Sequence, residues 1–412
     1  MKQKLIIISL LIGLTAPLIT TSCSNNKHDS TKESTEQDTT DTSSEVTSSE
    51  SQTLLYLDNS KSMLGYSKDI PGYINVLTQL TKYRKNTQVL LCCDNYKPLT
   101  GNVVDQVKRL NYGGSSLLHD DLRTMVNKVN DNNIIFFVTD GIMSGTTEDI
   151  KKDKEWTKRH AADLKLSIKE IFQGRNDLAV SVYQFASQFD GTYFCYDNNP
   201  NNITTQRYFY VFVLGKDESV KEFKSKIVGT EYFKPVNQLH IIDKLPLTGG
   251  INVKNTQKSV VNSDTVWVFD LKEINNKKDD PKMLVVTVKA SPFRNELNEN
   301  QIENLSEKFR VTAGGREVST DDISYDSGSG KYTIKLNPSA YGKQFDVEIE
   351  VPFSIPGWVA LSSCADDMYM KGKNKADNKT FLLQEFIGGM VQGKLGENEL
   401  LYKTTVHVKR TK

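Results

Sequence analysis

The chain has 412 residues, of which 25% are charged and 37% hydrophobic, and its 52 lysines and arginines nearly balance its 51 aspartates and glutamates. A chain above about 300 residues usually folds as more than one domain. The near-neutral charge argues against nucleic acid as the main partner, because phosphate binding requires a concentrated basic face. With 25 glycines and 5 cysteines, the composition also excludes a collagen-like or disulfide-dense scaffold.

Residues 1–23 have the pattern of an export signal. Lys2 and Lys4 precede an apolar run from Leu5 to Ile19, which is too short for a comfortable transmembrane helix. The stretch that ends in Cys23 resembles a bacterial lipoprotein signal, in which the cysteine becomes the acylated first residue of the mature chain. The resemblance implies a lipid anchor at Cys23 and a place in the bacterial cell envelope, at the outer membrane. A cleaved signal with an incidental cysteine is the alternative.

Residues 24–53 are predicted to form a disordered tether. Half of them are serine or threonine, seven are acidic against two lysines, and Val46 is the only apolar side chain. Such a segment cannot form a core and stays extended and solvated. The tether would hold a folded body away from a lipid surface.

Residues 54–245 alternate short apolar runs with helical patterns. Uninterrupted apolar runs of this length are typical of strands that are buried on both faces. The predicted strands are 54–57, 89–93, 134–138, 178–183 and 208–213, and the helical patterns cover 74–80, 117–129 and 148–172. The alternation predicts an α/β fold with a doubly wound, mostly parallel sheet and helices on both faces.

Residues 246–412 change to short, often alternating strands, which predict a β-rich, sandwich-like domain. The predicted strands are 266–271, 284–288, 309–312, 331–336, 345–351 and 400–408. One helix, from Leu382 to Val391, carries an apolar stripe that has no obvious partner within a sandwich. We expect a chain that ends near Leu245 to fold alone, unless this helix packs against it.

Polar side chains gather where two of the predicted strands end. Asp58, Ser60 and Ser62 follow the first strand, and Asp140 follows the strand 134–138. Loops at the carboxyl ends of strands converge in open α/β sheets, and a set of oxygen ligands suits a hard divalent cation. Ser115 opens a helix after Gly113 and Gly114 and can bring a further hydroxyl to the same edge.

These three segments, in this order, resemble the von Willebrand factor type A (VWA) domain with its metal-ion-dependent adhesion site. The family pattern is an Asp-x-Ser-x-Ser loop, then a Gly-Gly-Thr-like loop, then an apolar strand that ends in Thr-Asp-Gly. The resemblance covers about residues 54–245. It implies Mg²⁺, or alternatively Mn²⁺ or Ca²⁺, coordinated directly by Ser60 and Ser62, with Ser115 as the third hydroxyl. Asp58 and Asp140 would act mainly through bound waters.

The resemblance implies a non-enzymatic protein that binds a protein partner, whose Asp or Glu carboxylate completes the metal coordination. An envelope assembly or regulatory factor that works with an ATPase or a complex is the second interpretation, and a metal-dependent hydrolase is the third. A binding protein needs an exposed metal, whereas a hydrolase needs a base beside it. A turn in which Asp58 and Ser60 only cap backbone groups, and a degenerate site without metal, are the structural alternatives.

Overall fold

The computed structural model describes residues 51–114, 118–142, 155–197, 199–241, 250–254, 256–261, 264–270, 283–289, 309–326, 329, 331–371 and 377–411. The predicted signal, the predicted tether up to residue 50 and Ser115 lie outside these residues. Among the residues that are described, no helix is long and apolar enough to cross a membrane.

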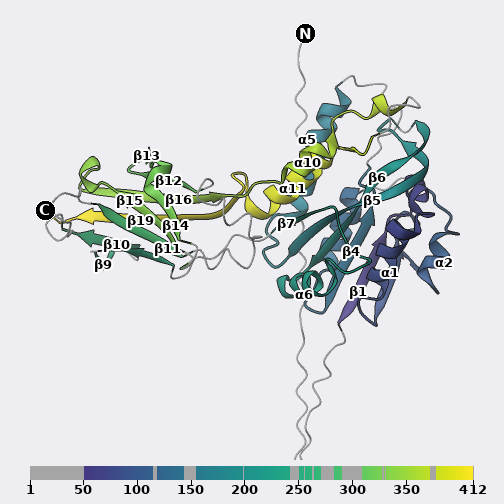
Figure 1. The fold of residues 1–412 in the computed structure, drawn as a ribbon, viewed down its shortest axis with the longest axis horizontal. Helices are drawn as coiled ribbons and strands as arrows, with labels where there is room; N and C mark the ends of the chain where they lie inside the picture. Colours follow the sequence, from purple (N-terminus) through teal and green to yellow (C-terminus); the bar gives the residue numbers. More distant parts are fainter. Residues whose placement is uncertain are drawn as a thin grey trace, which may run out of the picture. The chain divides into compact units, whose positions relative to one another are not determined.

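A seven-stranded sheet in the order β3-β2-β1-β4-β6-β5-β7 organises the N-terminal part of the chain (Figure 1). Its central strands coincide with the apolar runs of the sequence. These runs are buried, and the backbone groups of buried segments must form hydrogen bonds with each other. The strands are β1 (Gln52–Leu57), β2 (Thr87–Leu91), β3 (Lys97–Leu99), β4 (Asn133–Thr139), β5 (Ala179–Phe194), β6 (Pro200–Gly215) and β7 (Asn237–Ile241).

The sheet is mixed, so the prediction of a mostly parallel sheet is wrong. Strand β1 pairs in parallel with β2 and β4, whereas β3, β6 and β7 are antiparallel to the strands beside them. The physical reason is the link 195–199 between β5 and β6. Five residues join two strands of 16 residues each, and a link this short permits only a hairpin. The broader prediction of an α/β protein is confirmed.

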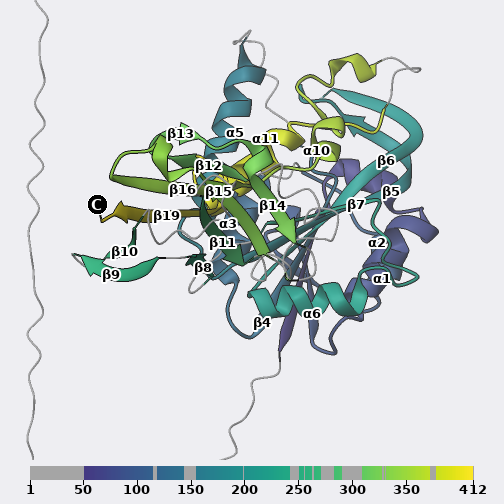
Figure 2. The ribbon, with the colours of Figure 1, turned by 60° about the vertical axis from the view of Figure 1, so that its left-hand side comes forward.

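Helices cover both faces of this sheet, as the sequence predicts. Alternate strand residues belong to different buried clusters, with Leu54 and Tyr56 on one face and Leu55 and Leu57 on the other. The first face packs against α3 (Leu118–Lys128) and α5 (Trp156–Phe172), and the second against α1 (Asn75–Thr81) and α6 (Asp217–Ile227). Figure 2 shows α5 and α6 on opposite sides of the strands. Shorter helical turns are η1 (Lys61–Tyr66), η2 (Ile70–Ile74), η3 (Cys92–Asp94) and α2 (Val103–Val107).

The helix predicted at 382–391 is α11 (Leu383–Leu395), and its partner is α5 (Figure 1). Two glycines allow the close approach. A Cβ on Gly389 would lie 2.6 Å from the Lys165 carbonyl oxygen, and one on Gly393 would lie 2.6 Å from that of Lys169. Lys394 Nζ also donates hydrogen bonds to the carbonyl oxygens of Arg175 and Leu178. The α/β part therefore receives a helix from far beyond residue 245.

The residues that lead into α11 form short elements. They are α10 (Gly357–Leu361), β17 (Ser363–Cys364), η6 (Met368–Lys371) and β18 (Thr380–Phe381). Strands β17 and β18 pair in parallel as a small sheet of their own.

The remaining strands build a β-rich part of two sheets, in the orders β13-β12-β16-β19-β10-β9 and β14-β15-β11-β8. Phe309, next to the first sheet, stacks on Tyr332 of the second with ring centroids 4.2 Å apart, as expected for a sandwich. The pairing of β10 with β19 is parallel and is the exception to the antiparallel pattern that we expected. The elements are β8 (Ile251–Val253), β9 (Gln257–Val261), β10 (Asp264–Phe269), β11 (Leu284–Lys289), β12 (Arg310–Ala313), β13 (Arg316–Glu317), η4 (Thr320–Asp322), β14 (Ile323–Asp326), β15 (Lys331–Leu336), η5 (Pro338–Ala340), β16 (Gln344–Pro352) and β19 (Leu400–Arg410).

Candidate metal site

The predicted site begins at the carboxyl ends of β1 and β4, which are parallel neighbours. Asp58 directly follows β1 and Asp140 directly follows β4, so both carboxylates lie at the same edge of the sheet. The backbone N–H of Asp58 still donates to the Val138 carbonyl oxygen at 3.0 Å, which fixes the start of the loop against β4. The structure thus brings together two segments that are about 80 residues apart in the sequence.

Hydrogen bonds hold the loop after β1 in a defined conformation. Asp58 Oδ1 accepts from the backbone N–H of Ser60 at 2.9 Å, and its Oδ2 accepts from the Thr139 hydroxyl at 2.7 Å. The hydroxyl oxygens of Ser60 and Ser62 lie 3.2 Å apart. Two hydroxyls at this separation can both contact one cation placed beside them.

Thr139 is a residue whose role the sequence analysis did not assign. Besides holding Asp58, its hydroxyl oxygen accepts from the Gly141 N–H at 3.0 Å, and so it connects the two strand ends. The sequence feature that could have indicated this role is a threonine at the end of a strand, directly before Asp-Gly. Its hydroxyl keeps Asp58 turned toward the β4 end.

The third predicted segment also reaches this edge in its described part. The Gly113 N–H donates to the Asn59 carbonyl oxygen at 3.2 Å. Asn59 in turn binds the end of β2: its Oδ1 accepts from the Cys93 N–H at 2.8 Å, and its Nδ2 donates to Asp94 at 3.1 Å. Asn59 therefore joins the segments that contain the candidate ligands, whereas the position of Ser115 itself is outside the described residues.

The four described candidate ligands are all buried. Their exposed fractions are 0% for Asp58, 7% for Ser60, 6% for Ser62 and 1% for Asp140. Burial, together with the charge of Asp140, raises the pKa of Asp58 to about 7. Burial also raises the pKa of Asp140, against the opposing effects of the Ser62 hydroxyl and the positive charge of Arg207. Two acids are thus held close together in a place that disfavours their ionisation.

The two carboxylate oxygens of Asp140 differ in their hydrogen bonds within the described part of the chain. Its Oδ1 accepts from the Ile142 N–H at 3.0 Å, whereas Oδ2 is buried and has no hydrogen-bond donor among the described residues. A buried carboxylate oxygen without a donor is costly, and a bound cation or water would remove that cost. This unpaired oxygen distinguishes the site from a simple capped turn.

The donor set fits a hard divalent cation. The described part of the chain holds no cluster of three His, Cys, Asp or Glu side chains that could bind a metal, which is the usual arrangement for zinc. Two hydroxyls and two carboxylates instead provide an all-oxygen set, which is typical of Mg²⁺, Mn²⁺ or Ca²⁺ sites.

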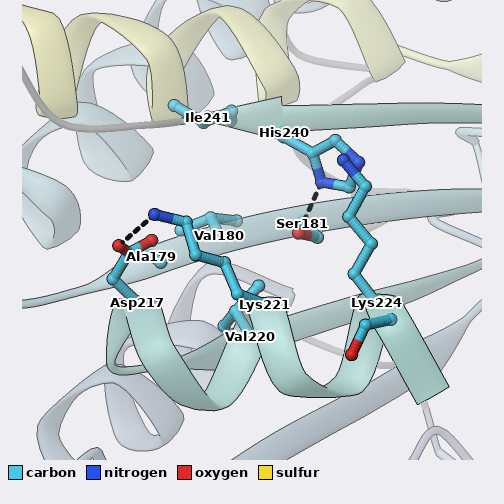
Figure 3. A pocket seen from close by; sticks show the side chains of 10 residues that line it. Ala179, Val180, Ser181, Asp217, Val220, Lys221, Lys224, His240 and Ile241 are labelled. Carbon is cyan, nitrogen blue, oxygen red and sulfur yellow. Dashed lines mark hydrogen bonds and ion pairs between the residues drawn. The ribbon is translucent and has the colours of Figure 1, made fainter. Parts of the chain in front are cut away.

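A separate cavity of about 390 Å³ lies between α6 and the strands β5 and β7 (Figure 3). At its base the Ser181 hydroxyl and His240 Nδ1 are 2.7 Å apart, while His240 Nε2 is buried and has no hydrogen-bond partner among the residues that the structure describes. Burial and the charge of Lys224 lower the pKa of His240 to about 3, so the ring is neutral at pH 7. Neither Ser181 nor His240 was singled out as a site residue from the sequence.

Comparison with known proteins found no matching protein-family model, no similar curated protein and no similar solved structure. A function is therefore inferred from the geometry of the sheet edge.

Proposed function

We propose that this protein is a surface- or periplasm-tethered lipoprotein that binds a protein partner through a divalent metal at a VWA-type adhesion site. Ser60 and Ser62 coordinate the metal directly. Asp58 and Asp140 supply negative charge and orient its water ligands. Ser115 is the sequence prediction for a third hydroxyl. Cys23 carries the lipid, and the tether that follows it gives the folded part its reach from the membrane.

The observation that carries this proposal is the pair of buried acids at the sheet edge, whose charges need a counter-charge when both are ionised. Two buried carboxylates, Asp58 and Asp140, lie next to two hydroxyls, and one carboxylate oxygen has no donor among the described residues. Arg207 is the buried side chain whose positive charge acts on Asp140. One guanidinium balances one of the two acids, and a divalent cation balances the set with charge to spare.

That remaining charge explains why the partner would supply an acid. A metal held by neutral hydroxyls keeps most of its positive charge, because its direct protein ligands do not neutralise it. An Asp or Glu side chain of a partner would add the missing negative ligand and complete the octahedron. The site would then bind selectively those partners that present one correctly placed carboxylate.

A capture experiment tests the proposal. The immobilised protein is exposed to detergent-solubilised cell-envelope proteins with Mg²⁺ or with EDTA, and the captured proteins are identified. We expect at least one protein to be retained with Mg²⁺, lost with EDTA and lost from the Asp140→Ala variant. The control is Asp105→Ala, which removes an exposed acid from α2. Equal retention by Asp140→Ala and the wild type would show that binding does not use this site.

A further inference from the structure

Residues 362–371 and 377–381, here called the cover segment, pack against the sheet near the candidate metal site. Asp367 anchors the first half of the cover segment. It is fully buried, and its carboxylate accepts hydrogen bonds from the Tyr193 hydroxyl at 2.6 Å and the Tyr196 N–H at 2.9 Å. Gln184 Nε2 adds a bond to the Ser362 hydroxyl at 2.9 Å. The long β5–β6 hairpin thus holds a segment that is more than 160 residues away in the sequence.

Arg207 of β6 anchors the second half of the cover segment. Its guanidinium donates to the carbonyl oxygens of Asp377 at 2.6 Å and Lys379 at 3.0 Å, and it lies over the Tyr193 ring at 4.3 Å. The same positive charge acts on Asp140. One buried cation therefore contacts the cover segment and acts electrostatically on a candidate metal ligand.

The cover segment reaches the strand end that carries Asp140. A Cβ placed on Gly141 would lie 3.3 Å from Thr380 Cγ2, and the Thr380 hydroxyl is 3.1 Å from that of Tyr210. Met370 is fully buried in the same apolar cluster as Ile142. Gly141 also has a φ of 71°, so a larger residue would be strained as well as crowded there.

The three described acids of the cover segment are all engaged, and Asp366 accepts from the Met368 N–H at 2.8 Å. Asp367 binds the hairpin, and Asp377 accepts from the Tyr369 hydroxyl at 2.7 Å and the Lys379 N–H at 2.9 Å. Thr380 of the cover segment packs beside Gly141, so the cover segment contacts the strand end that carries the candidate ligand Asp140. The burial of the candidate ligands agrees with this arrangement, whereas an adhesion site in use needs an open metal.

Resting on the proposed function, we infer that the cover segment is a built-in lid of the adhesion site, and that a partner carboxylate reaches the metal only after the lid detaches. The closed state is the one seen here. The partner then binds only the open state. Its apparent affinity is therefore lower when a larger fraction of the molecules is closed.

Hydrogen exchange measured by mass spectrometry tests the lid without any metal. Tyr193→Phe removes one hydroxyl that binds Asp367 across the interface, whereas the control Tyr369→Phe removes one hydroxyl that binds Asp377 within the cover segment. We expect Tyr193→Phe to speed exchange by about five- to tenfold in the cover segment and in residues 139–142 together, as for one lost buried hydrogen bond. The control should leave residues 139–142 unchanged.

A second variant, Asp367→Asn, keeps the shape of the side chain and weakens the same anchor. Faster exchange in the cover segment with unchanged exchange at 139–142, in both variants, would show that the cover segment is not a lid over the site. Unchanged exchange everywhere would show that Asp367 is not its anchor, and would also overturn the inference.

Mn²⁺ then separates the lid from the proposed function. Bound Mn²⁺ speeds water-proton relaxation in proportion to water access, so opening variants should raise the relaxivity per bound ion above that of the wild type. Equal relaxivity in the wild type and in both variants would contradict the lid. Absence of Mn²⁺ binding in every variant would refute the proposed metal site, while hydrogen exchange would still decide whether the cover segment opens.

Discussion

The two faces of the seven-stranded sheet obtain their helices from different parts of the chain. The two helices over the face under α1 and α6 lie between residues 75 and 227. The face under α3 and α5 shares its buried cluster with α11, which follows most of the β-rich strands in the sequence. The face under α1 and α6 thus obtains its helices locally, although Met370 also joins its buried cluster, whereas the face under α3 and α5 needs a helix from far along the chain.

Ending the chain at residue 245 should have the largest effect, because it removes α11 from the face under α3 and α5, together with the cover segment on the β5–β6 hairpin. Ile168 and Phe172 of α5 are fully buried, and the cut would expose the side of α5 that α11 covers. Apolar side chains that become exposed in this way favour aggregation. We therefore expect the shortened chain to be insoluble or to unfold without cooperativity, as measured by circular dichroism during urea unfolding.

A soluble shortened chain with a single cooperative transition would contradict this difference between the faces. It would mean that α5 is stable without α11, as the sequence alone suggested.

Two neighbouring glycines of α11 test how tightly this helix packs against α5. Gly389→Ala places a methyl group 2.6 Å from a backbone carbonyl of α5, and overpacking of this kind costs about 2 kcal/mol of unfolding free energy. Gly388→Ala is the matched control, because its Cβ would meet only the flexible end of Lys165, at 3.4 Å. Alanine also favours a helix, so this variant should stay within about 1 kcal/mol of the wild type. Urea unfolding of both variants measures the difference, and equal stabilities would show that α11 and α5 separate easily.

For the face under α1 and α6 we predict instead that acid lowers the free energy of unfolding. The cavity of this face holds His240, whose pKa of about 3 in the folded protein lies below the ordinary value of 6.5. A histidine whose pKa is lowered by folding contributes stability above pH 6.5 and loses it as the pH falls. The expected loss from this residue between pH 7 and pH 5 is about 2 kcal/mol.

His240→Gln should lack that part of the acid sensitivity, while Ser181→Ala, which keeps the titrating ring, should retain most of it. Urea unfolding at the two pH values checks both variants. If His240→Gln and the wild type lose equal stability, the ring is not held neutral in the folded protein.

Much of the first strands and of the candidate site could be predicted from local sequence. The uninterrupted apolar runs at 54–57 and 134–138 can be buried only as central strands, and Asp58 and Asp140 stand directly after them. Once both runs are placed side by side, their acids must meet at one edge. The period of the apolar residues predicted the strands, whereas the grouping of their ends into one metal site came from the resemblance to the VWA pattern.

The rest depends on partners that are distant in sequence. Strand β6 reads as a short apolar run, because its first half contains polar residues such as Arg207, and the long hairpin was therefore missed. Asp367 could not be recognised as a buried anchor, since no local pattern shows that Tyr193 will bind it. A buried charge is made possible by its partners, and those partners lie more than 150 residues away.

The central claim is that Asp58, Ser60, Ser62 and Asp140 hold a divalent metal, and calorimetry with Mg²⁺ tests it most directly. We expect the wild type to bind the ion and to gain about 2.7 kcal/mol of unfolding free energy at a hundredfold excess over the dissociation constant. Asp58→Ala should fold yet show neither the heat of binding nor the gain, while Asp105→Ala should behave as the wild type. A wild type that shows no heat and no metal-dependent stabilisation with Mg²⁺ or Mn²⁺ would contradict the account.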